Sequence, residues 1–224
     1  MAEGAAEVEA GSKNAAAALV TLQYWLSPAF PVGAYAYSHG LERAVAAGWV
    51  NDRQSLETWL KALLRCGSFR ADAVLFAAAF RARKAGNATE LAEIAELAEA
   101  LAPSRERHLE TMAQGRAFAE ATGDTARPWP VAVGAAAADL DIELVTAVAS
   151  FLQAAIVNLC SVAQRSVPIG QTDALAVVTA LREAFLETAA WAAAANLAEL
   201  GSATFFSDIA SMQHEVQETR LFRS

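Results

Sequence analysis

Three histidines and two cysteines are the side chains of this 224-residue chain best suited to bind a metal ion. His39, His108 and His214 lie far apart, and none has a second histidine or a cysteine at helical spacing. Cys66 and Cys160 also lack the close spacing of a metal knuckle. A site assembled only in the folded chain stays open as an alternative. The pattern itself predicts no metal site and no cofactor.

A second set of residues could support nucleophilic catalysis. Ser38, His39 and Glu42 are the types of a nucleophile, a base and an orienting acid, but they follow one another too closely for the usual triad geometry. Ser38 is better explained as the N-cap of a helix that begins near His39. The charged run Arg105–Glu110 is typical of a solvated helix face with i,i+3 and i,i+4 pairs. We therefore expect no catalytic residue and a protein that is not an enzyme, with an enzyme built on either set as the alternative.

The segment Ser27–Glu42 has the most unusual composition in the chain. Pro28 and Pro31 fix the backbone and remove two donors, so the segment is neither interior helix nor central strand. Its aromatic residues, Tyr35 and Tyr37 among them, make it too apolar for a free linker. Spacing alone favours a buried connector between two helices. The alternative is a shaped surface loop that a partner recognises.

Composition and charge exclude several classes of partner. Hydrophobic residues make up 55% of the chain and charged residues 19%, so it either buries much of itself or gives a large apolar face to a partner. The net charge of -8 argues against binding nucleic acid or an anionic membrane. Residues 1–13 lack the basic start and apolar core of a signal peptide, so a cytoplasmic protein is expected. The uncharged stretch 144–163 could span a bilayer by length, but its internal polar residues and the lack of an aromatic belt favour a buried helix.

Hydrophobic periodicity and Pro/Gly punctuation predict an all-α, single-domain helical bundle. Residues 1–14 are expected to be a disordered leader, 15–212 the helical domain and 213–224 an extended tail that docks on a partner. Helices are expected over 15–26, 41–47, 51–84 with a break at Gly67, 87–102, 104–122, 131–138, 139–165, 172–200 and 205–212.

Several short motifs, in this order along the chain, resemble the UreF family of urease accessory proteins. They are Ser27-Pro28, Phe30-Pro31-x-Gly33, Tyr37-Ser38-x-Gly40-Leu41-Glu42, Gly48-Trp49-Val50, Ser104-Arg105-Glu106, Gly115-Arg116, Val167-Pro168-Ile169-Gly170-Gln171, Met212-Gln213-His214-Glu215 and Arg220-Leu221-Phe222-Arg223-Ser224.

The resemblance implies an all-α homodimer that is not itself an enzyme. Members of the family bridge the GTPase UreG and the protein UreD (UreH in some species) on apo-urease. The resulting complex delivers Ni²⁺ to the urease active site, and the family is also proposed to gate or stimulate GTP hydrolysis by UreG.

Carried over position by position, the resemblance also implies partner-binding residues. Tyr35 falls on the UreG-facing side of the loop, with Tyr37 as its anchor. Arg165 falls where the family often has a lysine coupled to UreG, although a cation at a helix C-terminus explains it equally simply. The family's tail often has an aromatic residue where Glu218 and Thr219 stand here, which makes the docking contact weaker or different. The remaining expected contacts are Gln171, Arg220, Leu221, Phe222 and Arg223.

Overall fold

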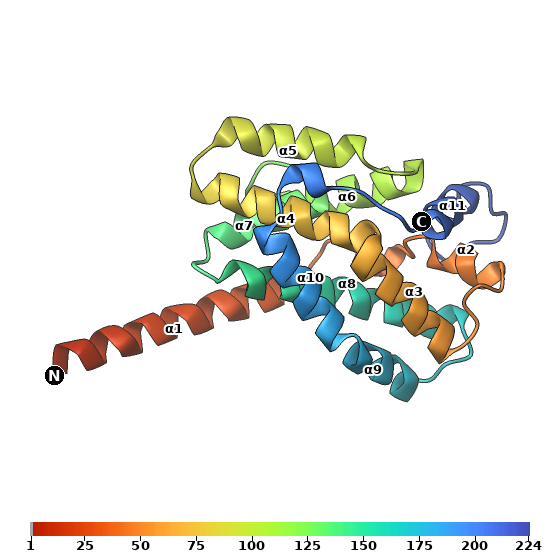
Figure 1. The fold of residues 1–224 in the computed structure, drawn as a ribbon, viewed down its shortest axis with the longest axis horizontal. Coiled ribbons are helices and arrows are strands. Elements are labelled where there is room, and N and C mark those ends of the chain that lie inside the picture. The colour runs from red at the N-terminus through yellow and green to blue at the C-terminus, as the bar shows by residue number, and fades with distance from the viewer. Residues whose placement is uncertain (1) are drawn as a thin grey trace.

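The chain is an all-α bundle, as predicted. The computed structural model describes residues 2–224, with side chains from Asn14 onward, and this part of the chain contains helices and loops and no strand (Figure 1). In chain order the helices are α1 (Ala2–Trp25), the 3-10 turn η1 (Ala34–Ala36), α2 (Leu41–Ala46), α3 (Arg53–Cys66), α4 (Ser68–Lys84), α5 (Ala88–Ala100), α6 (Arg105–Thr122), α7 (Trp129–Ala138), α8 (Leu144–Ser166), α9 (Gln171–Ala180), α10 (Arg182–Ala194), the 3-10 turn η2 (Leu197–Glu199) and α11 (Phe205–His214).

Helix α4 forms the centre of the bundle and packs against α3, α5, α7, α8 and α10. Its closest neighbour is α7, because small residues let the two backbones approach. A Cβ built at Gly134 of α7 would lie 2.4 Å from the carbonyl oxygen of Phe76 on α4. The alanine-rich stretches of both helices therefore serve close packing and not only helix propensity.

Cap geometry confirms the predicted starts of α5 and α6. Asn87 accepts a hydrogen bond from the backbone of Glu90, and Ser104 accepts one from the backbone of Arg107. At the start of α3 the capping box forms between Asp52 and Ser55, one residue later than the pattern suggested. Gly67 breaks the predicted helix 51–84 into α3 and α4.

Two long predicted helices are revised by the structure. The prediction of one helix over 172–200 is wrong, because the chain bends at Leu181 between α9 and α10. This bend lets α9 pack on α3 and α8 while α10 packs on α8 and α4. Helix α8 begins at Leu144 and not at residue 139, since Glu143 caps it by accepting from the backbones of Val145 and Thr146.

The first helix is longer than predicted. It runs from Ala2 to Trp25, so it includes most of the segment 1–14 that was expected to be a disordered leader. That part extends away from the bundle in Figure 1, whereas Ala18 and Leu22 near the other end are buried. The backbone of a segment this rich in alanine has a high helix propensity even without packing. The division at residue 14 stays a prediction.

By length and composition, α8 alone among the described helices could cross a membrane. One face of α8 is buried, through residues such as Phe151, Leu152 and Ile156. Its other face carries Ser150, Gln153 and Ser161. The sequence had suggested a helix buried on all sides, but this face is partly exposed. Its residues line the cavity described below.

Candidate functional site

Residues expected to contact partners come from three distant parts of the sequence, and most of them meet in one place. The guanidinium of Arg165 on α8 donates a hydrogen bond to the carbonyl oxygen of Tyr35, 3.1 Å away. The same guanidinium lies over the ring of Phe222, with 4.3 Å between Cζ and the ring centroid. The loop, the end of α8 and the tail therefore form one structural unit.

The loop that presents Tyr35 turns through left-handed backbone conformations. Gly33 has a φ of 69°, and the consecutive residues His39 and Gly40 have φ values of 56° and 76°. A positive φ is unfavourable for a histidine, so the surrounding contacts must hold it. The side-chain amide of Asn158 on α8 also donates to the carbonyl oxygen of Ala34, 3.1 Å away. The side chain of Asn158 on α8 therefore helps to fix the position of the loop, which the sequence did not indicate.

The tail lies against this loop and does not extend freely. The backbone N–H of Arg223 donates to the carbonyl oxygen of Ala36 (2.8 Å). The backbone N–H of Ser38 donates to the carbonyl oxygen of Ser224 (2.7 Å). The side chain of Phe222 is buried and belongs to the main hydrophobic core. The prediction that Ser38 caps the next helix is wrong, because its hydroxyl also donates to Ser224 and Gly40 stands at the N-cap of α2.

Glu42 is the main polar anchor of the tail. It lies in the first turn of α2 as predicted, but its carboxylate points to the tail. The backbone N–H groups of Leu221 and Phe222 donate to its two oxygens at 2.8 and 3.1 Å. A buried carboxylate with two backbone donors is a strong, charge-assisted contact. Glu42 therefore fixes the register of the tail on the loop.

His214, at the end of α11, joins Glu42 to a second buried carboxylate. Its Nε2 lies 3.0 Å from Glu42, and its Nδ1 lies 2.7 Å from Glu106 on α6. The ring is fully buried. Arg220 donates to the other oxygen of Glu106 at 2.9 Å. We call Glu42, Glu106, His214 and Arg220 the tail network.

A second buried polar cluster lies beside the first and contains Glu110 and Arg107. The Arg107 guanidinium is 2.6 Å from the Glu110 carboxylate, which also accepts from the hydroxyl of Ser224 at 2.8 Å. Burial raises the pKa of Glu110, but Arg107 and His39 outweigh it and hold that pKa well below the usual range. Asp72 lies 3.7 Å from the same guanidinium, and burial raises the pKa of this carboxyl to about 6 against the opposing effect of Arg107.

The buried position of these charges corrects the interpretation of 105–110 as a solvated face. Glu106, Arg107 and Glu110 are all buried, because the tail and the loop cover this side of α6. Arg105 and His108 on the other side are solvent-accessible, and His108 pairs with Glu99 at 2.9 Å. The i,i+3 pairing of Arg107 with Glu110 was correctly indicated, but its environment was not.

The three residues considered as a triad do not assemble into one. Ser38 bonds to Ser224 and Glu42 bonds to the tail, whereas His39 Nε2 lies 2.6 Å from the hydroxyl of Ser68. Glu110 is 3.5 Å from the other ring nitrogen of His39 and is already bound by Arg107. Burial, followed by Arg107, lowers the pKa of His39, and its ring is 3% exposed. This arrangement satisfies buried polar atoms and directs Ser38, His39 and Glu42 to three different partners.

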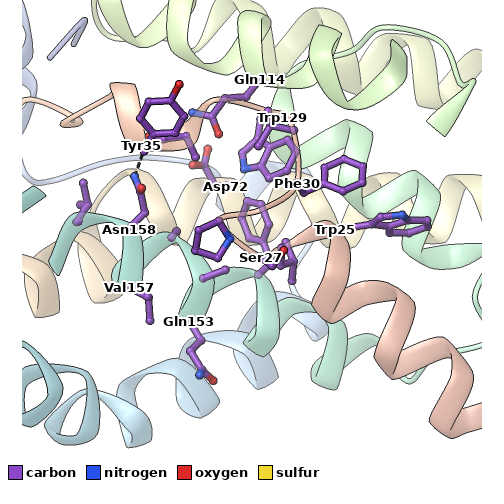
Figure 2. A pocket seen from close by; sticks show the side chains of 18 of the residues that line it. Trp25, Ser27, Phe30, Tyr35, Asp72, Gln114, Trp129, Gln153, Val157 and Asn158 are labelled. Atoms are coloured by element: carbon purple, nitrogen blue, oxygen red, sulfur yellow. Dashed lines mark hydrogen bonds between the residues drawn. The ribbon is translucent and has the colours of Figure 1, made fainter. Parts of the chain in front are cut away.

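A cavity of about 360 Å³ lies between the loop and the exposed face of α8. Figure 2 shows Tyr35 and Asn158 at one side, Trp129 and Phe30 as aromatic walls, and Asp72 between them. No group of three or more His, Cys, Asp or Glu residues suited to a metal ion occurs among the described side chains. The cavity adjoins the loop that carries Tyr35.

The remaining predicted contact residues differ in accessibility. Tyr35 is 66% exposed and Leu221 is 69% exposed, so both are available to a partner, whereas Tyr37 is buried. Gln171 is exposed at the first position of α9 and, among the described residues, forms no side-chain hydrogen bond to the loop or the tail. The structure therefore does not bring Gln171 to the site.

Beside the tail, α11 presents an apolar surface to solvent. Phe205, Ile209 and Met212 lie on one side of the helix, Val216 follows just after its end, and the four are 42% to 82% exposed. Phe206 adds to this surface and packs edge-on against Trp49, with 5.3 Å between ring centroids. An exposed apolar stripe of this length is typical of a protein-binding surface.

Comparison with known proteins gives the same family as the sequence motifs. A model of the UreF family matches residues 50–182. The chain is 48% identical over 224 residues to the urease accessory protein UreF of Rhodopseudomonas palustris (strain BisA53), which covers 93% of this chain and 94% of the relative. It is 48% identical to the protein of that name from Bradyrhizobium diazoefficiens, with 93% of each covered. It is 49% identical over 221 residues to urease accessory protein UreF 1 of Brucella canis, covering 92% of this chain and 94% of the relative.

These matches extend over nearly the whole chain, and the matched region 50–182 includes α3 to α9. With the all-α fold and the tail packed on the loop, they lead to one conclusion: the chain belongs to the UreF family.

Proposed function

We propose that this chain is a non-enzymatic scaffold of urease maturation. It bridges a UreG-type GTPase and a UreD-type (UreH-type) protein on apo-urease, acts as a homodimer in the cytoplasm, and supports Ni²⁺ delivery to the urease active site. The observation that carries the proposal is the convergence of Tyr35, Arg165 and the tail residues 220–223 on one surface. Family membership supports the choice of partners.

On this proposal the two partners use adjacent surfaces. Tyr35 is exposed beside Arg165 and forms the UreG-facing edge. Leu221 and Arg223 point outward from the tail while Phe222 points inward, so the tail offers alternate side chains to the UreD-type partner. The apolar stripe of α11 continues that surface and supplies the hydrophobic area that a stable complex needs.

The direct test is recruitment by variants of the loop. Tyr35→Ala should weaken co-elution with UreG by about tenfold, as expected for an aromatic interface anchor. Helix content by circular dichroism should stay unchanged, because the ring is exposed. Leu186→Ala, at a similarly exposed position on α10, is the control. Normal recruitment by Tyr35→Ala together with a lower melting temperature would restore the view that the loop is only a connector.

Deletion of residues 213–224 is a poor test of tail docking. His214 and Phe222 are buried in the body of the protein, so the deletion also removes core contacts. Substitution of Leu221, which is 69% exposed, separates the two effects. Leu221→Asp should abolish complex formation with UreD and leave thermal stability unchanged. Three proteins that elute separately even with the unmodified chain would contradict the scaffold proposal.

A role as activator of UreG hydrolysis is the second candidate, and the structure favours Arg223 for it. Arg165 and Arg220 are both held by contacts within the chain. Arg223 is exposed, and its guanidinium makes no ion pair or side-chain hydrogen bond to any described residue. An arginine supplied in trans can raise the rate by about 10³ to 10⁵. GTP turnover by UreG that is insensitive to Arg223→Ala would leave the scaffold role alone.

A further inference from the structure

In the tail network, the two carboxylates that face His214 need two hydrogen-bond donors, and a neutral imidazole supplies only one. Both ring nitrogens of His214 lie within 3.0 Å of carboxylate oxygens, one from Glu42 and one from Glu106. An ionised carboxylate is an acceptor only, so each ring nitrogen must carry a hydrogen to make these contacts. A neutral imidazole has one N–H and would turn a lone pair towards the second carboxylate.

The charges that face the ring support the same assignment. Glu42 approaches from α2, Glu106 from α6 and Arg220 from the tail itself. With a neutral ring, the two buried carboxylates and the partly exposed Arg220 sum to one negative charge, and an imidazolium brings the sum to zero. The neighbouring Arg107 is already paired with Glu110 and also lies 3.7 Å from Asp72, so it supplies no charge to the tail network. A buried carboxylate is costly to ionise unless it is paired and hydrogen-bonded.

We propose that His214 is held as an imidazolium and that this charge latches the tail onto the loop, so that loss of one proton releases residues 220–224. Glu42 connects the two events, because it binds His214 and also the backbones of Leu221 and Phe222. When the ring turns neutral, either Glu42 or Glu106 loses a donor in a fully buried site. The backbone N–H groups of the tail then give up their hydrogen bonds to Glu42 and are hydrated instead.

Release of the tail would also loosen the loop. Phe222 would leave the Arg165 guanidinium, and the backbone bonds that Ala36 and Ser38 make to the tail would break. The device is therefore a proton-sensitive link between the tail and the loop that carries Tyr35. It acts within one chain and needs no partner to be observed.

Hydrogen exchange with the isolated chain tests the latch. Amide protection of 220–224, corrected for intrinsic exchange, should fall by about tenfold or more as pH rises, the loss expected for one charged hydrogen bond. The midpoint should coincide with the titration of the His214 ring followed by ¹⁵N NMR. A neutral ring in a chain whose tail stays protected would overturn the proposal.

Two variants sharpen the test. Glu106→Gln gives a side chain that can accept from Arg220 and donate to a neutral ring, so tail protection should vary less than about twofold with pH. His214→Gln removes the charge and should leave the tail poorly protected at every pH. His108→Gln, at the exposed pair with Glu99, is the matched control and should behave like the unmodified chain. Unchanged pH dependence in Glu106→Gln contradicts the latch, whether or not the His214 variant folds.

The consequence for assembly rests on the proposed function. If the tail docks on a UreD-type protein, capture of that protein should vary with pH in the unmodified chain and not in Glu106→Gln. A latch seen by exchange without any change in capture would leave the intramolecular switch standing and count against its role in recruitment. Absence of capture at any pH would count against the scaffold proposal alone.

Discussion

The guanidinium of Arg165 on α8 stacks on the ring of Phe222 in the tail, with 4.3 Å between Cζ and the ring centroid, and it donates a hydrogen bond to the backbone of Tyr35. The arginine thus contacts a ring face and the carbonyl oxygen of Tyr35 at once, and its Nε also donates to the carbonyl oxygen of Ser161 at 3.3 Å. The planar guanidinium can satisfy both, whereas an ammonium is a point charge. A position that sequence alone explained as helix-end compensation therefore links the loop to the tail.

Although the family often has a lysine at this position, replacing Arg165 by lysine should weaken UreG recruitment in this chain without unfolding it, because the guanidinium contacts both Tyr35 and Phe222 here. The stacking contact is worth about 0.5–1 kcal/mol at an exposed site, and the hydrogen bond to Tyr35 about 1 kcal/mol. We expect roughly a tenfold loss of affinity in a pull-down titration. Arg182→Lys, at an exposed arginine on α10, is the control. Equal affinity for Arg165→Lys and the unmodified chain would show that the guanidinium is not needed.

The two apolar residues of the tail should behave in opposite ways. Phe222→Ala removes a buried ring from the core and should lower the free energy of unfolding by about 3 kcal/mol. Leu221→Ala, at a side chain that is 69% exposed, should change it by less than about 0.5 kcal/mol. Urea denaturation measures both values. Equal effects would mean that the tail does not pack on the body in solution.

Asp72 should make the protein less stable as pH rises. Burial raises its pKa from the ordinary 3.8 to about 6, so between these values the unfolded chain binds fewer protons than the folded chain. Stability from this group is therefore lost as pH rises from about 4 to 6, and at pH 7 the ionised carboxylate costs on the order of 3 kcal/mol.

The corresponding variant is Asp72→Asn, which removes the cost of ionisation. Its free energy of unfolding should exceed that of the unmodified chain at pH 7, and the difference should shrink towards pH 4. Asp141→Asn, at a side chain that is 95% exposed, should show no such trend. A destabilised Asp72→Asn at pH 7 would mean that the carboxylate is needed to compensate Arg107.

Gly115→Ala should be among the most destabilising small changes in the chain. A Cβ at this position would lie 1.8 Å from the carbonyl oxygen of Arg127, which is backbone and cannot move aside cheaply. We expect a loss of about 3 kcal/mol or more, as for severe overpacking. Gly201→Ala is the control, since nothing lies within 4 Å of its Cβ position. Similar melting temperatures for the two variants would contradict the tight contact between α6 and the segment before α7.

Much of the fold could be read from local signals. Caps at Asn87 and Ser104 and the break at Gly67 depend on residues within one helical turn, so the sequence states them directly. The bend at Leu181 could not be read in this way. Nothing in the local sequence of α9 and α10 interrupts helix propensity, and the bend comes from the different partners that the two helices pack against.

The site was predictable only in part. Motif resemblance selected Tyr35, Arg165 and the tail, and the structure brings these together, but it leaves Gln171 elsewhere. The tail network was missed because Glu42, Glu106 and His214 are separated by up to 172 residues. The sequence held one signal for it. Glu106, Arg107 and Glu110 lie on the same side of α6 as the apolar Phe118, and burying charged side chains there is costly unless they are paired with other polar groups.

The backbone hydrogen bond from Ser38 to Ser224 joins residues that are 186 positions apart in the sequence. A contact of such separation forms late in folding, because the intervening chain must already be compact for the two ends to meet. During synthesis the loop emerges from the ribosome early, but it acquires its final shape only after residues 220–224 have been made. On the proposed function, a partner that recognises this loop would therefore bind only chains whose helical body has already folded.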